Sequence, residues 1–243
     1  YTIVGPNVTL DDGVKLMSHV VVEGITLIGA NTVVFPFASL GNPPQDLKYK
    51  GEPSKLEIGC NNVIREQVSM NPGTEGGGMV TKIGNNCLFM VGAHVAHDCI
   101  IDDHVILVNN ATLGGHVEIA EWAIIGGLSA IHQFVRIGRH AMVGGMSGIE
   151  NDIIPYGSVI GNRARLQGLN IVRLKRDVVA GFNICCIGDE KNYTYLASRA
   201  GDTLSDQVAL HVLKHLAPDF KRHSFLDRGS DERQYCAPGV DLP

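Results

Sequence analysis

Several features of large protein classes are missing from this chain of 243 residues. It has no run of about 18 apolar residues and no signal-peptide pattern, so we expect no membrane span and a cytoplasmic location. The net charge of −5 lacks the basic excess of nucleic-acid-binding proteins, so nucleic acid is not an expected partner. Six cysteines do not make a disulfide scaffold in a chain this long, and Cys87 and Cys99 are expected as reduced core residues.

What the sequence does contain is a six-residue periodicity of large apolar side chains. The periodicity holds over residues 4–40 and 58–70, and a third stretch keeps its phase over twelve positions. That stretch comprises Ile83, Phe89, Val95, Ile101, Leu107, Leu113, Ile119, Ile125, Ile131, Ile137, Val143 and Ile149. Small or β-branched residues, such as Cys99 and Ala111, follow most of these positions four residues later. Neither a helix nor an alternating strand repeats at six, so the pattern predicts an all-β solenoid, a parallel β-helix of hexapeptide repeats.

The repeat also predicts a domain organisation. Three hexads make one coil, so residues about 18 apart should stack on successive coils. We expect residues 1–160 to form the β-helix, with loop excursions at 41–56 and 71–82 where the rhythm breaks. Residues 161–243 are expected to form a smaller, mainly helical C-terminal region, with a polar tail of the composition typical of disorder. The chain begins within a hexad at Tyr1, so a further N-terminal coil outside this sequence is an open alternative.

Histidine is the side chain best suited to general-base catalysis near neutral pH. The densest histidine group lies in the longest repeat and comprises His94, His97 with Asp98, His116, and His132 with Gln133. His97 and His116 are 19 residues apart, which places them on adjacent coils of one edge, and His132 lies near the same register. Adjacent side chains on a strand point to opposite faces, so Asp98 can orient His97 only at a corner. The alternative is a corner residue without a catalytic role, which is our interpretation of His19, His104 and His140.

Two glycine pairs, Gly114–Gly115 and Gly144–Gly145, leave bare backbone at the outer surface of the predicted prism. Their amides can donate to an oxyanion or their small size can open a groove; alternatively, glycine satisfies a corner that requires a positive φ. The chain has no nucleophile-elbow or Cys–His signature, so covalent catalysis is not expected. A basic stretch from Arg163 to Arg176 suits phosphate or an acidic partner, although a solvated helix face has the same composition.

Several strings carry a resemblance to a known family: QDLKYKGEP (45–53), GAHVAHDC (92–99), NNATLGGHV (109–117), AIIGGLSAIHQF (123–134), MVGGMSG (142–148) and GNRARLQGLN (161–170). Over residues 1–176 the chain resembles the bacterial UDP-N-acetylglucosamine O-acyltransferases of lipid A synthesis. The resemblance implies a left-handed parallel β-helix followed by a helical C-terminal part, assembled as a homotrimer with active sites in the clefts between subunits. It also implies transfer of an (R)-3-hydroxyacyl chain from acyl carrier protein to the 3-hydroxyl of UDP-N-acetylglucosamine, with no metal and no other cofactor.

Site residues follow from the same resemblance, position by position. His97 matches the catalytic base, Asp98 matches its partner, and the backbone amide of Gly115 matches the oxyanion donor. Gly145 matches the position that limits acyl length, where glycine indicates a long chain. Substrate-contacting positions of the family are matched by Asp46, Lys48, His94, His116, His132, Gln133, Asn170 and Arg176.

The chain also departs from the family pattern. Asn71, Val172 and Asp177 stand where the family often has a histidine, an acidic residue and a basic residue, respectively. Beyond Arg176 the expected helical sequence is replaced by DVVAGFNICCIGDEK, and residues 177–243 do not align with the family.

Three alternatives stay open at this point. The related N-acyltransferase that acts on an acylated UDP-glucosamine shares the fold and the donor. A zinc enzyme of the γ-carbonic-anhydrase type would use three histidines as ligands, here His94, His97 and His116. A solenoid that has lost its activity is the non-enzymatic alternative.

Overall fold

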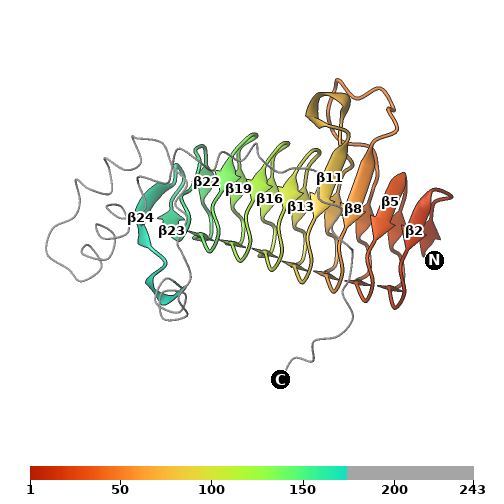
Figure 1. Cartoon of the computed structure of the whole chain (residues 1–243), viewed down its shortest axis with the longest axis horizontal. Helices are drawn as coiled ribbons and strands as arrows, with labels where there is room; N and C mark the ends of the chain where they lie inside the picture. Colours follow the sequence, from red (N-terminus) through yellow and green to blue (C-terminus); the bar gives the residue numbers. More distant parts are fainter. Residues whose placement is uncertain (174–243) are drawn as a thin grey trace, which may run out of the picture.

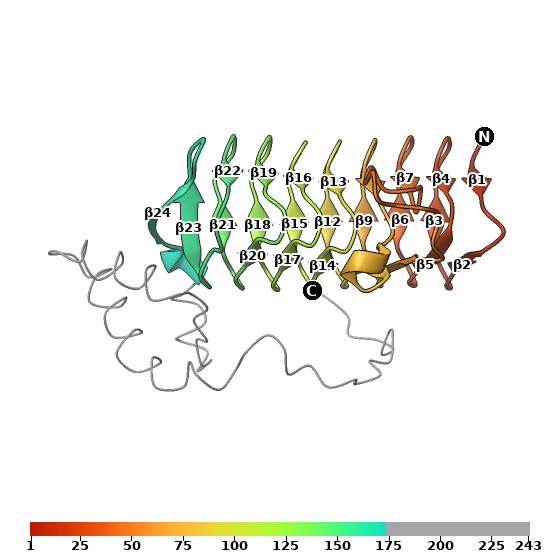
Figure 2. The same ribbon diagram turned by 90° about the horizontal axis from the view of Figure 1, so that it is seen from above.

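A computed structural model of the chain describes residues 1–173. Short parallel strands form three sheets, which wrap into a triangular prism whose coils follow one another along its long axis (Figures 1 and 2). The coil is left-handed, as the resemblance implies. The predicted parallel β-helix of hexapeptide repeats is therefore confirmed. Within residues 1–173 no helix has both the length and the apolarity needed to cross a bilayer.

Each of the three sheets takes one strand from most coils. Sheet A contains β1 (Ile3–Val4), β4 (Val21–Val22), β7 (Ser39–Leu40), β10 (Ser69–Met70), β13 (His94–Val95), β16 (Thr112–Leu113), β19 (Ala130–Ile131) and β22 (Gly148–Ile149). Sheet B contains β2 (Val8–Leu10), β5 (Ile25–Ile28), β8 (Lys55–Ile58), β11 (Val80–Ile83), β14 (Ile100–Ile101), β17 (Glu118–Ile119) and β20 (Arg136–Ile137). Sheet C contains β3 (Lys15–Leu16), β6 (Val33–Val34), β9 (Val63–Ile64), β12 (Leu88–Phe89), β15 (Ile106–Leu107), β18 (Ile124–Ile125), β21 (Met142–Val143), β23 (Gly157–Ile160) and β24 (Arg165–Leu169).

From Val22 onward the large residue of each hexad fills the inside of the prism, whereas Val4 and Leu10 in the first coil are exposed. Val95 pairs with Leu113, and Leu113 pairs with Ile131, so residues eighteen apart stack as the repeat predicts. Leu107 and Leu113 have no exposed surface, and the small residues Cys87 and Cys99 are also buried in the same core. Both cysteines are free thiols, and burial raises the pKa of each to about 12. The core is thus one continuous column of apolar side chains.

Most corners of the prism turn through a residue in the left-handed region of φ. Asp98, His116 and Phe134 have φ of 58°, 61° and 65° at the corner between sheets A and B, on three successive coils. A non-glycine residue in this region costs roughly 1–2 kcal/mol, a cost that the stacking of the coils offsets. His19, His104 and His140 also have positive φ, which confirms them as corner residues.

Two loops interrupt the coils and project from one side of the prism (Figure 1). The first spans residues 41–54 between β7 and β8, and the second spans 71–79 between β10 and β11 and contains the short 3-10 helix η1 (Glu75–Gly77). The bounds expected from the sequence, 41–56 and 71–82, extend too far. Their last residues belong to β8 and β11, where Lys55 pairs with Val80. Both strands are four residues long and alternate in burial, so each pairs over a longer stretch than the hexad repeat predicts.

The C-terminal end of the prism differs from a simple continuation of the repeat. Ile153 and Val159 still fill inward positions, but they align with Ile137 and Val143 at a spacing shortened to sixteen residues. The strand β24 then folds back antiparallel on β23. The region expected to be mainly helical therefore begins with a strand that pairs with the last rung. The helical elements expected further on lie outside the described residues.

The core assignment predicts a large difference between two leucines. Leu107 is fully buried between stacked coils, whereas the side chain of Leu128 is 62% exposed. We expect Leu107→Ala to lower the free energy of unfolding by about 2–5 kcal/mol, because it leaves a cavity in a packed column. Leu128→Ala is the matched control and should change it by less than about 0.5 kcal/mol. Thermal and urea unfolding measure both, and equal effects would contradict the assignment.

Candidate active site

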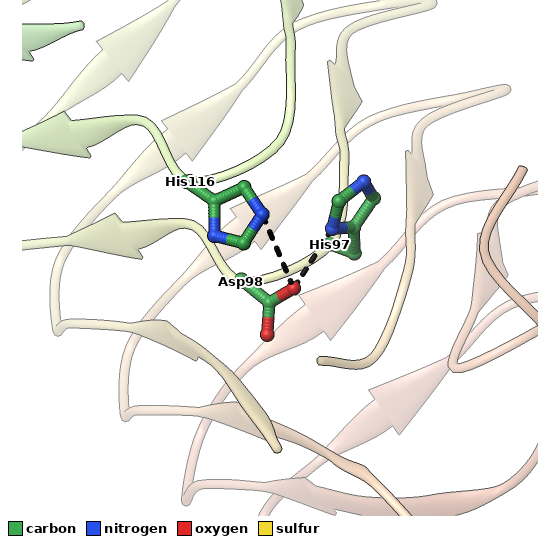
Figure 3. Close-up of side chains that lie close together, drawn as sticks. All are labelled: His97, Asp98 and His116. Atoms are coloured by element: carbon green, nitrogen blue, oxygen red, sulfur yellow. Dashed lines mark hydrogen bonds and ion pairs between the residues drawn. The ribbon is translucent and has the colours of Figure 1, made fainter. Parts of the chain in front are cut away.

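A histidine–aspartate pair lies at the corner that follows β13. His97 Nδ1 is 2.8 Å from Asp98 Oδ2, and the carboxylate has no exposed surface while the imidazole is 12% exposed (Figure 3). Both residues belong to the turn, and the positive φ of Asp98 brings two adjacent side chains together. The condition set by the sequence, that the pairing requires a corner, is met. Because Nδ1 faces the carboxylate, Nε2 is the nitrogen that remains to accept a proton.

The Asp98 carboxylate is held by a residue that sequence reasoning missed. The backbone N–H of Thr74 donates to Asp98 Oδ1 at 2.8 Å, and the Thr74 hydroxyl donates to Oδ2 at 2.6 Å. The backbone N–H of Asp98 in turn donates to the hydroxyl of Thr81 at 2.8 Å. A buried carboxylate needs such donors to stay charged. The only signal in the sequence was that Thr74 lies in a loop that breaks the rhythm.

His116 lies one coil further along the same corner. Its ring meets that of His97 edge to face, with ring centroids 5.1 Å apart, and its Nε2 is 3.9 Å from Asp98 Oδ2. On its other side the ring stacks on Phe134 at a centroid distance of 4.4 Å. Burial lowers the pKa of His116, an effect that the Asp98 charge opposes and that His97 reinforces. The predicted neighbourhood of His97 and His116 is confirmed.

The other histidines of the predicted group lie in different surroundings. His94 is half-buried on β13, and its Nδ1 lies 2.7 Å from the hydroxyl of Ser69 on the neighbouring strand β10. Burial lowers the pKa of His94, and His97 lowers it further. His132 and Gln133 are exposed, and His132 Nδ1 lies 3.1 Å from the Gln133 carbonyl oxygen. Within residues 1–173 no hydrogen bond or ring contact joins His132 or Gln133 to His97.

The glycine pairs serve close approach and not backbone conformation. None of Gly114, Gly115, Gly144 and Gly145 has a positive φ, so the interpretation as left-handed corners is wrong. A Cβ at Gly115 would lie 2.6 Å from His97 Nε2, and one at Gly144 would lie 2.8 Å from Ile160 Cδ1. Within residues 1–173 the Gly115 amide has no hydrogen-bond acceptor. Bare backbone with a free N–H donor therefore lies beside the imidazole.

The remaining predicted positions are spread over the prism. In the first loop Asp46 Oδ1 accepts a hydrogen bond from the Lys48 N–H at 3.0 Å, and the Asp46 charge acts on His116. Lys48 and Gly145 are exposed. Asn170 lies against a different corner, where its N–H donates to the Tyr156 carbonyl and its Nδ2 donates to the His140 carbonyl. Within one chain the structure does not bring Asn170 to His97. Arg176 and Asp177 lie outside the described residues.

A possible metal-ligand set at this corner differs from the one that the sequence suggested. The nitrogen and oxygen atoms of His97, Asp98 and His116 lie within 4.8 Å of one another. His94 is not part of that group, and its Nδ1 lies against the Ser69 hydroxyl. Two of the three histidines proposed for zinc are thus joined by a carboxylate that already accepts hydrogen bonds from Thr74 and His97.

Comparison with known proteins gives the class of the fold first. The family described as bacterial transferase hexapeptide (six repeats) matches residues 81–115, which include the His97–Asp98 corner. A second family, described as a domain of unknown function (DUF4910), matches residues 156–243. The stretch from Asp177 onward, where the sequence resemblance ends, lies within this second match.

Solved structures and curated relatives give the family. A crystal structure of a UDP-N-acetylglucosamine acyltransferase superposes with a TM-score of 0.73 at 44% identity, over 89% of this chain and 82% of that one. LpxA from Acinetobacter baumannii gives a TM-score of 0.73 at 38% identity, over 90% and 91% of the two chains. The acyl-(acyl-carrier-protein)–UDP-N-acetylglucosamine O-acyltransferase of Paracoccus denitrificans is 62% identical over 144 residues, which are 59% of this chain. That of Agrobacterium fabrum is 49% identical over 173 residues, 71% of this chain.

The chain belongs to the UDP-N-acetylglucosamine acyltransferase family. It spans 55% of the length of the Paracoccus relative and 64% of the Agrobacterium one.

The lowered pKa values of two histidines predict how stability depends on pH. Burial is the first cause at both His94 and His116, which keeps them neutral below their ordinary pKa of 6.5. The unfolded chain therefore takes up more protons than the folded one as the pH falls through about 6.5, and the free energy of unfolding decreases. We expect the melting temperature to decline between about pH 7.5 and 5.5, and to decline less in a His94→Gln, His116→Gln variant.

The exposed His132 supplies the control for this measurement. His132→Gln, which replaces an exposed imidazole, is measured alongside as the matched variant. A double variant with the same pH dependence as the wild type would contradict the assignment of burial as the cause.

Proposed function

We propose that the protein transfers an (R)-3-hydroxyacyl chain from acyl carrier protein to the 3-hydroxyl of UDP-N-acetylglucosamine. The observation that carries the proposal is the His97–Asp98 pair beside the bare backbone of Gly115, in a chain of this family. An imidazole whose Nδ1 is occupied by a buried carboxylate is oriented as a general base at Nε2. A backbone N–H without an acceptor next to that nitrogen suits a developing oxyanion.

The proposed reaction proceeds without a covalent enzyme intermediate. His97 Nε2 removes the proton of the sugar 3-hydroxyl as its oxygen attacks the thioester carbonyl carbon. The Asp98 carboxylate stabilises the imidazolium that forms, and the Gly115 N–H donates to the oxyanion. The C–S bond then breaks, an ester is left on the sugar, and the thiol of the carrier protein takes the proton back from His97. A positioned base contributes about 10²–10⁴-fold to such a step.

Substrate contacts are assigned to the remaining positions of the site. Asp46 and Lys48 from the first loop, and His94, His116, His132 and Gln133 from the coils, are assigned to contacts with the substrates. Gly145 leaves room for a long acyl chain, because it is exposed and has no side chain. Asn170 and Arg176 are assigned to the uridine diphosphate. The acyl donor is the acylated carrier protein, and no further cofactor enters the scheme.

A homotrimer is part of the proposal. Asn170 and His97 lie at different corners of one prism, so one protomer alone does not place both on the same substrate. A cleft between neighbouring protomers brings different corners of two prisms together. This supports a site shared by two subunits. A cytoplasmic location follows from the proposed substrates, a nucleotide sugar and an acyl carrier protein.

Replacement of the base tests the proposal directly. We expect His97→Ala to lower kcat by at least about a hundredfold, because the hydroxyl proton then has no acceptor. The assay measures acyl transfer from hydroxyacyl carrier proteins of several chain lengths to UDP-N-acetylglucosamine, and His19→Ala, at an exposed corner of the first coils, is the control. Turnover near that of the wild type in the His97 variant would refute the role of the base.

The bare backbone at Gly115 makes a second, independent prediction. Its φ is not in the left-handed region, so alanine fits the backbone, but its Cβ would overlap the His97 ring. We expect Gly115→Ala to lower kcat by about 10²–10³-fold through displacement of the base and of the oxyanion donor, without loss of the fold. Gly168→Ala is the matched control, because among the described residues no atom lies within 4 Å of a Cβ at this position. Equal rates for the two alanine variants would contradict the prediction.

The same assays separate the rival functions. Product with an acylated UDP-glucosamine and none with UDP-N-acetylglucosamine would assign the chain to the related N-acyltransferases. The cluster of His97, Asp98 and His116 supports a zinc enzyme as the second candidate. Stoichiometric zinc in the purified protein, with no acyl transfer, would favour it. Absence of both activities would leave the scaffold alternative.

A further inference from the structure

The second loop of the prism is held against the catalytic corner by one side chain. Thr74 begins η1, where a threonine hydroxyl ordinarily accepts a hydrogen bond from an N–H of the first turn. Here it makes no such bond. Its hydroxyl instead donates to Asp98 Oδ2 at 2.6 Å, while its N–H donates to Oδ1 at 2.8 Å. The Thr74 hydroxyl therefore binds the Asp98 carboxylate and not an N–H of the first turn of η1.

We propose that Thr74 is a positioning residue that fixes the Asp98 carboxylate and, through it, the orientation and tautomer of His97; this inference rests on the proposed function. Asp98 Oδ2 accepts from both the Thr74 hydroxyl and His97 Nδ1. With both donors in place the oxygen has a defined position, so the imidazole plane is defined as well. An ionised carboxylate accepts only, which places the proton of His97 on Nδ1 and leaves Nε2 unprotonated.

Burial and close packing around Thr74 support a specific contact with Asp98. Thr74 and Asp98 are each 5% exposed, so water does not compete for the carboxylate. Gly77 at the end of η1 lies so close to Asp98 that a Cβ at this position would overlap the carboxylate. The Thr74 carbonyl accepts from the N–H groups of Gly77 and Met79, which closes the loop on itself. The loop therefore presents a hydrogen-bonding face that fits one carboxylate.

The Thr74 contact also links the two loops. The Glu75 N–H, next to Thr74, donates to Glu52 Oε1 at 3.2 Å, and the Lys50 N–H donates to Glu52 Oε2 at 2.8 Å. Residues 41–54 carry Asp46 and Lys48, which are assigned to the acceptor substrate. Hydrogen bonds of the adjacent residues Glu75 and Thr74 thus connect the first loop with the Asp98–His97 corner.

Two substitutions at Thr74 separate positioning from packing. Thr74→Val keeps the shape and the backbone N–H but removes the hydroxyl, whereas Thr74→Ser keeps the hydroxyl. We expect Thr74→Val to lower kcat about ten- to a hundredfold with KM for UDP-N-acetylglucosamine unchanged, because a hydrogen bond to a charged group is lost. Thr74→Ser should restore most of kcat. Thr32→Val is the matched control, since the Thr32 hydroxyl is equally buried and donates to the Gly59 carbonyl at another corner.

A readout that does not depend on turnover completes the test. The Nδ1–H proton of His97, held against Asp98, is expected as a downfield proton resonance in the wild type and in Thr74→Ser. It should shift or be lost by exchange in Thr74→Val and stay unchanged in Thr32→Val. If the wild type transfers no acyl group, the proposed function fails, and the resonance alone decides on Thr74.

Two results would overturn the inference. One is wild-type kcat together with a wild-type resonance in Thr74→Val. The other concerns a valine variant that does not fold. In that case Thr74→Ala takes its place, and a serine variant as impaired as the alanine variant shows that packing, and not the hydroxyl, matters.

Discussion

The stacking of coils in a fixed register is the constraint on which the rest of the structure depends. Inward residues of successive coils pair in register, as Val95 does with Leu113 and Leu113 with Ile131, so each coil fixes the position of the next. Parallel strands lie about 4.8 Å apart, which brings equivalent corner residues of adjacent coils within ring-contact distance. Asp98, His116 and Phe134 occupy one such corner. The site therefore occupies a few successive coils of a long stack, and the pairing between coils holds its residues in place.

The same register allows loops to be inserted at little cost to the core. Met70 still pairs with both Leu40 and Val95, although residues 41–54 and 71–79 separate these strands along the chain. The prism thus tolerates excursions as long as the strands on either side return to phase. The second excursion places Thr74 over the buried Asp98 carboxylate. The carboxylate, whose partner within the repeat is His97, thus gains two further donors from a segment that does not belong to the repeat.

Absence of side chains shapes the site as much as their presence. At Gly115 the lack of a Cβ lets the His97 ring lie against the backbone, and at Gly77 it lets the loop close on the Asp98 carboxylate. Neither glycine is required by its φ. Close packing explains both, because a methyl group has no room between adjacent coils at Gly115 or between the loop and the corner at Gly77.

The sequence by itself determined the prism, its core and the corner that holds His97 and Asp98. A six-residue period that fills one column with Leu, Ile and Val admits few folds, and the 19-residue spacing of His97 and His116 already placed them on adjacent coils. Only the tertiary structure decided the role of the glycines, the ends of the two loops, and the contact of Thr74 with Asp98. Thr74 is 24 residues away from Asp98 and lies in a segment without periodicity. No local pattern encodes such a contact, because it depends on how a loop folds back over a prism that is already formed.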